Sequence, residues 1–460
     1  MPHTIKDTVE RDICIGCGAC AYASGGQIPI ILNDDGMYAA DLTGVPDDVL
    51  AAVDAVCPFS DAATDEDAFA AKLFGTNLTD HEFLGKYLGT YAGRVSSTPY
   101  LEGSSSGGMT SWLLRELVER DIVDAVINVG GAPADSDQIF SYDVTDPANL
   151  DTARKSKYYS TTMDDALRIV HATDRRYALV GVPCFIKSAR LVAERDAVIR
   201  ERVKFHVGLV CGHMKSQFFG ESLAWQLGIP PEDLETVDFR IKNPDRASSN
   251  YDFGAKSKSE DEWRKRRTGD LVGGNWGYAT FQPEVCNFCD DIFAETADVC
   301  FGDAWLPQYS PDWRGTNVVI SRSPLVDQIL EEGTSSGALE LDALNPEEVA
   351  KSQAGNFRHR RVGVSVRLAD DTAKGLSIPK KRVKPGYEGV DAKRLKIIRL
   401  RRELSRLSFS AYKDAKRHND LDVYLTAMEQ GIREYRQIDS PPPWRRAASK
   451  LKRTIRQLLR

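Results

Sequence analysis

Two hydrophobic patterns alternate along the middle of the chain, between about residues 90 and 210. Some segments repeat apolar residues at helical spacing, and others are short continuous apolar runs of the kind found in buried strands. The helical segments are 111–121, 163–173 and the stretch around 187–197, and the predicted strands are 124–131, 176–182 and 203–212. This alternation predicts a sheet with helices packed on it, and therefore a layered α/β domain.

The pattern differs on either side of this segment. Residues 1–62 form a small cysteine-bearing module that ends in an acidic, alanine-rich connector. Residues 63–345 hold the α/β pattern, a Lys- and Arg-rich stretch at 239–256 that we interpret as a loop, and a second cysteine group. Residues 346–460 are predicted to be a basic helical extension with a long charged helix near 392–407. The predicted fold class is therefore mixed α/β with α+β character.

Composition and charge narrow the functional class. The 460 residues are 42% apolar and 28% charged, which is ordinary for a globular protein. No run approaches the roughly 18 apolar residues that span a bilayer, and the start MPHTIKDTVERD lacks the apolar core of a secretion signal. We therefore expect a cytoplasmic protein. The net charge of −7 gives no general basic field, so no nucleic-acid partner is expected.

Nine cysteines in such a chain argue against a disulfide framework, because the cytosol keeps thiols reduced. Cys14, Cys17 and Cys20 are spaced as C-x-x-C-x-x-C, and Cys57 precedes a proline. This spacing is typical of a ferredoxin, in which four thiolates bind one [4Fe-4S] cluster. A structural zinc site also uses four thiolates and is the alternative, although zinc ribbons usually present two separated C-x-x-C hairpins.

Five further cysteines follow. Cys184 and Cys211 each come directly after a predicted strand, and Cys286 and Cys289 form a C-x-x-C pair. If the two strands are parallel neighbours, both thiols emerge at the same edge of the sheet, where the C-x-x-C loop could complete a second cluster. Two buried thiols beside a redox pair or a half zinc site are the alternative. Cys300 lies in a predicted buried strand and is interpreted as a core residue.

A serine- and glycine-rich loop precedes the helix at 111–121. The loop comprises Gly103, Ser104, Ser105, Ser106, Gly107 and Gly108. Backbone N–H groups exposed at such a helix start suit a phosphate, but a capped helix after a flexible turn explains the loop equally well. It is neither a Walker A loop nor a dinucleotide fingerprint. Ser156, Lys157 and Tyr158 provide a second candidate contact, or a solvated loop.

His206 and His213 flank Cys211 and are the nearest candidates for a proton donor. A histidine at either position more often has a structural role than a catalytic one. Asp290, Asp291 and Asp303 are equally ambiguous, because carboxylates in loops commonly cap helices or face solvent.

Several motifs in a fixed order point to one family. They are CIGCGAC with CPF, GSSSGGMTSWLL, SKYY, VGVPCFIKSAR, GLVCGH, FRIKN and CNFCDDIFAETADVCFGDAW. On these motifs the chain resembles the coenzyme F-420 hydrogenase/dehydrogenase beta-subunit family, which includes 7-hydroxymethyl chlorophyll a reductase, over roughly residues 10 to 340.

The resemblance implies a flavin, usually FAD with FMN as an alternative, beside two [4Fe-4S] clusters. It favours Cys184, Cys211, Cys286 and Cys289 as ligands of the second cluster, and it leaves Cys300 without a role. It also implies that the flavin lies on Ser106, Gly107 and Gly108, with Lys157 nearby.

The predicted function is an oxidoreductase that relays single electrons through the clusters to a flavin, which reduces or oxidises a small organic substrate or a deazaflavin coenzyme. A ferredoxin-like protein is the expected electron donor. Two other classes remain open: an electron-transfer subunit that serves a separate catalytic partner, and a zinc-stabilised binding protein.

The last residues form a separate feature. Residues 444–460 place apolar side chains at helical spacing among Lys and Arg, with no acidic residue. Such a helix could contact the inner face of a membrane or an acidic partner, or it could pack on its own domain.

Overall fold

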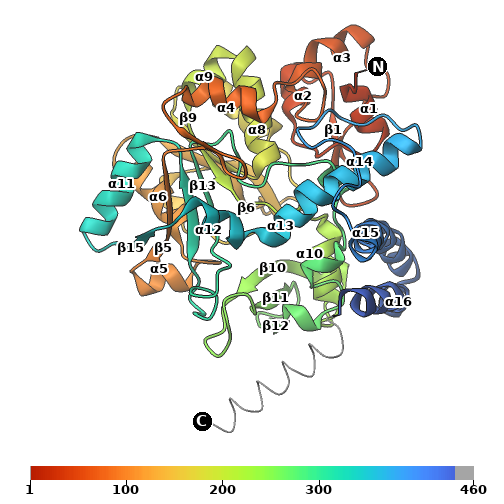
Figure 1. The fold of residues 1–460 in the computed structure, drawn as a ribbon. Helices are drawn as coiled ribbons and strands as arrows, with labels where there is room; N and C mark the ends of the chain where they lie inside the picture. The colour runs from red at the N-terminus through yellow and green to blue at the C-terminus, as the bar shows by residue number, and fades with distance from the viewer. Residues whose placement is uncertain (1, 441–460) are drawn as a thin grey trace.

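The computed structural model describes residues 2–440, and its largest element is an eight-stranded mixed sheet (Figure 1). The strand order is β15-β5-β14-β13-β9-β8-β6-β7. The central strands β6, β8, β9 and β13 are parallel, and every other pairing in the sheet is antiparallel. The strands are β5 (Gly89–Val95), β6 (Ala125–Gly131), β7 (Phe140–Thr145), β8 (Tyr177–Gly181), β9 (Val203–Leu209), β13 (Val299–Asp303), β14 (Asn317–Ser321) and β15 (Leu339–Ala343). The predicted mixed α/β class is confirmed.

Helices cover both faces of this sheet because successive strand residues point to opposite sides. On β8, Ala178 and Val180 pack in one core with helices α6 and α11, whereas Tyr177 and Leu179 pack in another core with α7 and α8. The helices around the sheet are α4 (Glu66–Phe74), α5 (Thr98–Glu102), α6 (Met109–Glu119), α7 (Asp164–Ala172), α8 (Pro183–Arg195), α9 (Ala197–Arg202) and α11 (Pro324–Ser335).

The stretch 239–256, interpreted as a loop, forms strands at both of its ends. Three antiparallel strands, β10 (Leu234–Ile241), β11 (Asp252–Ser257) and β12 (Trp263–Arg267), make a separate sheet beside helix α10 (Gln217–Trp225). The loop interpretation is therefore wrong for residues 239–241 and 252–256. Phe239 and Phe253 are buried in the core beside this sheet. Burial of these two aromatic side chains favours strands here, although the neighbouring residues are polar.

The N-terminal residues pack on the side of the large sheet that carries α7 and α8 (Figure 1). Ile15, Val56 and Phe59 belong to the same hydrophobic cluster as Leu167 and Ile186 of these two helices. Their elements are α1 (Ile5–Glu10), α2 (Ala19–Ala23), β1 (Ile30–Leu32), β2 (Tyr38–Ala40), α3 (Asp47–Val53) and η1 (Asp54–Val56), followed later by the hairpin β3 (Thr79–His81) and β4 (Gly85–Tyr87).

The C-terminal part returns across the molecule. Its elements are α12 (Pro346–Ser352), α13 (Ala354–Phe357), the π-helical turn η7 (Arg358–Val362), α14 (Gly363–Ala373), α15 (Ala392–His418) and α16 (Leu421–Asp439). The long charged helix, α15, pairs with α16, packs against α10, and belongs to the same hydrophobic cluster as the three-stranded sheet. Asp371, near the end of α14, forms an ion pair of 2.8 Å with Arg11. Within residues 2–440, no helix is both long and apolar enough to cross a bilayer. The predicted surface contact of 444–460 lies outside the described residues.

Candidate functional site

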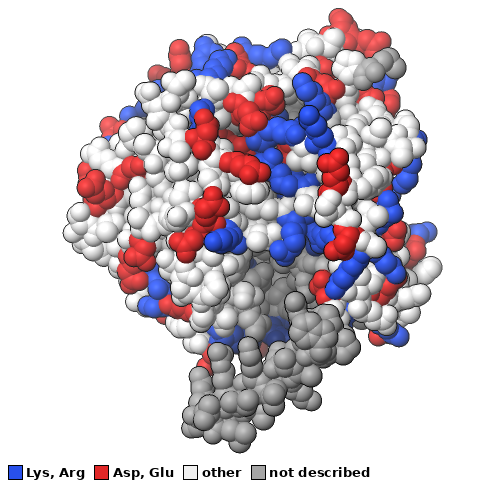
Figure 2. All heavy atoms as spheres, in the orientation of Figure 1, with Lys and Arg blue, Asp and Glu red and all other residues white. Residues whose placement is uncertain are grey.

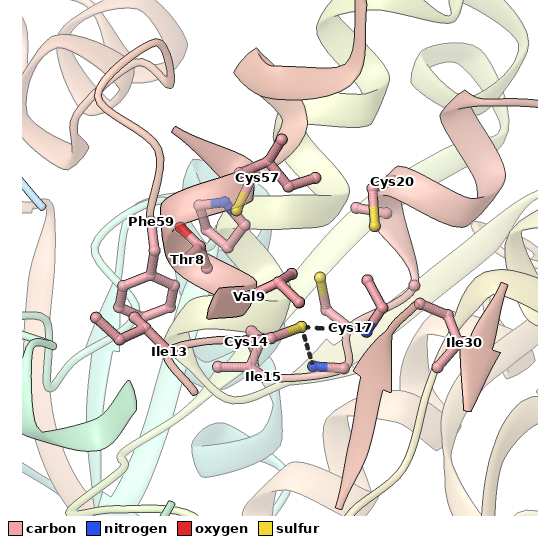
Figure 3. Close-up of a pocket in the computed structure, with 16 residues that line it drawn as sticks. Thr8, Val9, Ile13, Cys14, Ile15, Cys17, Cys20, Ile30, Cys57 and Phe59 are labelled. Carbon is pink, nitrogen blue, oxygen red and sulfur yellow. Dashed lines mark hydrogen bonds between the residues drawn. The ribbon is translucent and has the colours of Figure 1, made fainter. Parts of the chain in front are cut away.

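The first four cysteines line one cavity (Figure 3). The sulfur atoms of Cys14, Cys17, Cys20 and Cys57 are directed toward a common space, and the cavity volume, part of it open to solvent, is about 380 Å³. Thr8 and apolar side chains make up the rest of the cavity wall. The structure therefore brings together the four thiols that the sequence groups as the first metal site.

Glycines shape the loop that carries these thiols. Gly16 (φ +65°) and Gly18 (φ +83°) adopt the left-handed conformation, and a Cβ atom on Gly16 would lie only 2.2 Å from the carbonyl oxygen of Tyr38. Only glycine fits there. The Gly16 N–H donates to Cys14 Sγ at 3.4 Å, and the Ala40 N–H donates to the same sulfur at 3.5 Å. Backbone N–H donors of this kind stabilise sulfur ligands that carry negative charge.

The second four predicted ligands line another cavity of about 240 Å³. Cys184 is the second residue of α8, directly after β8, and Cys211 follows β9. Because β8 and β9 are parallel neighbours, both thiols emerge at the same edge of the sheet, which confirms the predicted geometry. Cys286 and Cys289 approach from the short helix η6 (Glu284–Asn287) and the turn after it. The Met214 N–H donates to Cys286 Sγ at 3.2 Å.

Arg360, from the π-helical turn η7, completes the wall of the second cavity. Its guanidinium donates to the carbonyl oxygens of Gly212 at 2.8 Å, Cys289 at 3.3 Å and Cys211 at 3.4 Å, and lies 3.7 Å from Cys211 Sγ. Among residues 2–440, no Asp or Glu oxygen lies within ion-pair distance of it. A buried cation is costly unless an anion compensates it, so the second cavity suits a negatively charged group.

Two residues line both cavities. Ile15, between Cys14 and Cys17, and Phe59, two residues after Cys57, line both of them. Groups held by the two cysteine sets would therefore be neighbours that contact the same two apolar side chains.

Burial keeps all these cysteines protonated when nothing is bound. It raises the pKa of Cys17 to about 11 and the pKa values of Cys57 and Cys211 to about 12. None of the described cysteines forms a disulfide. Within residues 2–440, no three His, Cys, Asp or Glu side chains lie close enough together to bind one metal ion directly. Four thiols per cavity, N–H donors to sulfur and the Arg360 charge fit an anionic, four-cysteine iron–sulfur cluster in each cavity.

The two segments predicted to contact a flavin lie side by side. The Ser156 N–H donates to Ser105 Oγ at 2.9 Å, which joins the loop before α6 to the segment 156–158. Lys242, just after β10, donates to the carbonyl oxygens of Leu101 at 2.6 Å and Ser106 at 2.8 Å. Three segments distant in sequence therefore meet at the start of α6.

This region holds two lysines, Lys157 and Lys242, that form no ion pair among the described residues. Lys157 donates only to backbone carbonyls, including that of Ala153 at 2.9 Å, and within the described chain neither Lys157 nor Lys242 has a carboxylate partner. Burial lowers the pKa of Lys157 to about 8 and the pKa of Lys242 to about 7. Two such lysines beside a helix N-terminus fit the phosphate groups of a flavin nucleotide.

The glycines of the loop have a packing role as well. A Cβ atom on Gly107 would lie 2.7 Å from the carbonyl oxygen of Gly93, and Gly108 has a φ of +79° at the N-cap of α6. Ser106 is buried, and its hydroxyl donates to the carbonyl oxygen of Thr316 at 3.2 Å. The fold alone therefore explains why these three positions hold small residues.

The two histidines lie in different surroundings. The ring of His213 lies 4.4 Å from that of Trp276, which also contacts Tyr158 at 4.8 Å. His213 is thus near the segment 156–158, and burial holds its pKa well below the ordinary value, so the ring is neutral. His206 is buried within β9, with its Nδ1 3.9 Å from Asp298, and lines neither cysteine cavity.

The remaining candidates have structural partners. Asp290 pairs with Lys381 at 3.0 Å, Asp291 accepts the Glu295 N–H at 3.1 Å, and Asp303 pairs with Arg240 at 2.8 Å. Cys300 is buried in β13 and lines neither cavity, as the core interpretation requires.

Sequence reasoning missed Arg360, Lys242 and Trp276. Arg360 belongs to the run Arg358-His359-Arg360-Arg361, which looks like a solvated basic turn. Lys242 lies in the quoted FRIKN motif, but the loop interpretation gave it no position. The sequence around Trp276 predicts no particular role for it, because a single aromatic residue between polar segments can be buried, exposed or part of a binding site.

Comparison with known proteins identifies one family over the middle of the chain. The model for the N-terminal part of the coenzyme F420 hydrogenase/dehydrogenase beta subunit matches residues 90–168, and the model for its C-terminal part matches residues 174–347. The matched residues include the second cysteine set and both segments that were predicted to contact a flavin. The first cysteine set precedes them and Arg360 follows them.

Individual relatives are more distant. A subunit of the F(420)H(2) dehydrogenase of Methanosarcina mazei is 24% identical over 220 residues, which cover 46% of this chain and 56% of that protein, so the match spans about half of the relative. An uncharacterized protein of Methanocaldococcus jannaschii is 25% identical over 253 residues, 52% of this chain and 81% of that protein. A chain in the F420-reducing [NiFe] hydrogenase complex from Methanosarcina barkeri aligns with a TM-score of 0.47 and 16% identity, covering 67% of this chain and all of that one.

Proposed function

Because the chain belongs to the coenzyme F420 hydrogenase/dehydrogenase beta-subunit family, we propose that it is an iron–sulfur flavoprotein oxidoreductase with two [4Fe-4S] clusters and one flavin, FAD or FMN. The observation that carries the proposal is the pair of four-cysteine cavities that share the side chains of Ile15 and Phe59. When bound, such clusters carry single electrons and a flavin couples them to two-electron chemistry.

Each group has a proposed set of residues. Cys14, Cys17, Cys20 and Cys57 would hold the first cluster, and Cys184, Cys211, Cys286 and Cys289 the second. Ser105, Ser106, Gly107, Gly108 and Ser156 would surround the flavin phosphates. Lys157 and Lys242 would supply the positive charge there.

His213 and Tyr158 would lie toward the reacting end of the flavin. Both contact Trp276, and the neutral imidazole of His213 has an Nε2 atom without a hydrogen-bond partner in the described chain. A neutral ring can accept one hydrogen bond and donate another. We propose that it faces the substrate, a small organic molecule or a deazaflavin coenzyme, whereas His206 has no part in the reaction.

The test uses single turnover. The protein is reduced anaerobically with dithionite, freed of excess reductant, and mixed with a deazaflavin coenzyme while the optical spectra of protein and coenzyme are recorded. We expect the protein to be reoxidised as the coenzyme is reduced in proportion. A protein that keeps its electrons with every small acceptor tested would contradict the catalytic role.

The second candidate is an electron-transfer subunit, as the name of the Methanosarcina mazei relative, a subunit of a dehydrogenase, suggests. In that case the same reduced protein would give its electrons rapidly to a one-electron acceptor protein but not to a deazaflavin or another small molecule. The single-turnover experiment therefore separates the two functions.

A further inference from the structure

Arg360 holds a fixed positive charge at the second cavity. Its side chain is 1% exposed, it lines the cavity, and it hydrogen-bonds the backbone of three of the four cysteines. The N-terminus of the 13-residue helix α8 adds a partial positive charge at the same cavity, because Cys184 lies in the first turn of this helix.

The first cavity has the opposite electrostatic surroundings. No charged side chain lines it, and residues 1–62 contain ten Asp and Glu but only two Lys and Arg. Among the described ion pairs, only one of these acids, Asp35, has a Lys or Arg partner, which is Lys413. Figure 2 shows acidic side chains at the end of the face that carries α3, and a band of Lys and Arg over the region of α13 and α14.

We propose that Arg360 is a positioning residue that makes the cluster of the second cavity the easier one to reduce. One electron then passes from the first cluster, which is oxidised, to the second, which is reduced, and no bond forms or breaks. A one-electron donor protein reloads the first cluster. This inference rests on the proposed function and adds the direction of electron flow.

The physical reason is charge. Reduction adds one negative charge to a cluster, and a nearby buried cation stabilises the reduced form strongly because the interior screens charge less than water does. A hydrogen bond to a ligand sulfur acts in the same direction, and Arg360 lies 3.7 Å from Cys211 Sγ. No Lys or Arg side chain lines the first cavity, so its reduced form has no comparable stabilisation there.

A purely structural role is the competing explanation, because Arg360 also ties together the loops after β9 and around η6. A structural role would affect stability and cluster retention but not the reduction potential of a retained cluster. Arg367 provides a matched control. It is equally buried and also donates to carbonyl oxygens, those of Asn287 and His359, but it lines neither cavity.

The test is an anaerobic redox titration of the full-length protein, followed by electron paramagnetic resonance and iron analysis. The proteins are wild type, Arg360→Met, Arg360→Lys and the control Arg367→Met. In Arg360→Met we expect the equilibrium constant for reducing the higher-potential cluster to fall at least tenfold, about 59 mV. Arg360→Lys should keep most of the wild-type equilibrium constant, and Arg367→Met should change this constant less than Arg360→Met does. The lower-potential cluster should not move.

Arg360→Gln replaces the methionine variant if that protein loses iron, since glutamine can still donate to the carbonyls without a charge. Unchanged potentials in a neutral variant that retains eight irons would overturn the inference and leave the proposed function intact. A wild-type protein without a second cluster would overturn both.

Discussion

Ile15 and Phe59 come from the two halves of the first cysteine motif, and together they form the partition between the two cysteine cavities. Ile15 lies inside the C-x-x-C-x-x-C run, and Phe59 follows the Cys57-Pro58 pair. Both side chains are buried in the core that joins the N-terminal elements to α7 and α8. The same residues therefore hold the N-terminal part on the sheet and separate the two sites.

Replacing Phe59 by alanine should lower the free energy of unfolding by about 3–5 kcal/mol, because it removes a buried aromatic ring and leaves a cavity. The measurement is urea unfolding under anaerobic conditions. The control is Ile31→Ala on β1, where the side chain is 45% exposed and a change within about 0.5 kcal/mol is expected. Equal effects at both positions would contradict the burial of Phe59 in the core that joins the N-terminal elements to α7 and α8.

A buried ion pair predicts a pH dependence. Glu66 and Lys187 lie 3.1 Å apart beneath the surface, and although burial alone would raise the pKa of Glu66, the charges of Lys187, Lys381 and Arg382 hold it below the ordinary value. The folded state therefore binds the Glu66 proton more weakly than the unfolded state. This contribution to stability is present above the unfolded pKa of about 4.3 and is lost as the pH falls below it.

The check is the urea midpoint measured between pH 7 and pH 3.5 for wild type and Glu66→Gln. We expect the wild type to lose more stability over the acid part of this range than the variant. Parallel curves would show that Glu66 makes no such contribution.

Lys242→Gln should weaken flavin binding at least tenfold, equivalent to about 1.4 kcal/mol, because it removes a half-buried amino group at the start of α6 that would be positively charged beside a phosphate. Flavin content after gel filtration and titration of the apoprotein with FAD and FMN measure this. Lys256→Gln is the control: Lys256 lies on β11 of the same small sheet and pairs with Asp261 at 2.7 Å. Comparable losses in both variants would remove Lys242 from the flavin site.

The strongest sequence signals were local and periodic, and the structure bears them out. The alternating pattern places β6, β8 and β9, and the position of Cys184 and Cys211 directly after two strands is sufficient to bring their thiols together once β8 and β9 are parallel neighbours. The spacing from Cys14 to Cys20 is also a local signal that does not depend on distant parts of the chain. A tight loop with glycines in positive φ can hold three thiols around one space.

Long-range burial of charge was not predictable. Arg360 and Lys242 lie in segments that resemble solvated basic loops, and only the tertiary fold buries Arg360 and half-buries Lys242. The three-stranded sheet was missed for the same reason, because Arg240 on β10 pairs with Asp303 and is buried as completely as an apolar residue. The domain boundaries at residues 62 and 345 remain predictions, but Arg360 shows that the segment after 345 contributes to the second site.

The most direct test of the account is the iron, acid-labile sulfide and flavin content of the anaerobically purified protein, compared with Cys57→Ser, Cys289→Ser and Cys300→Ala. We expect about eight irons, eight sulfides and one flavin per chain in the wild type and in Cys300→Ala. Each serine variant should lose about four irons while the other cluster and the flavin remain. A wild-type protein that contains zinc and no flavin, or serine variants that retain all their iron, would contradict the account.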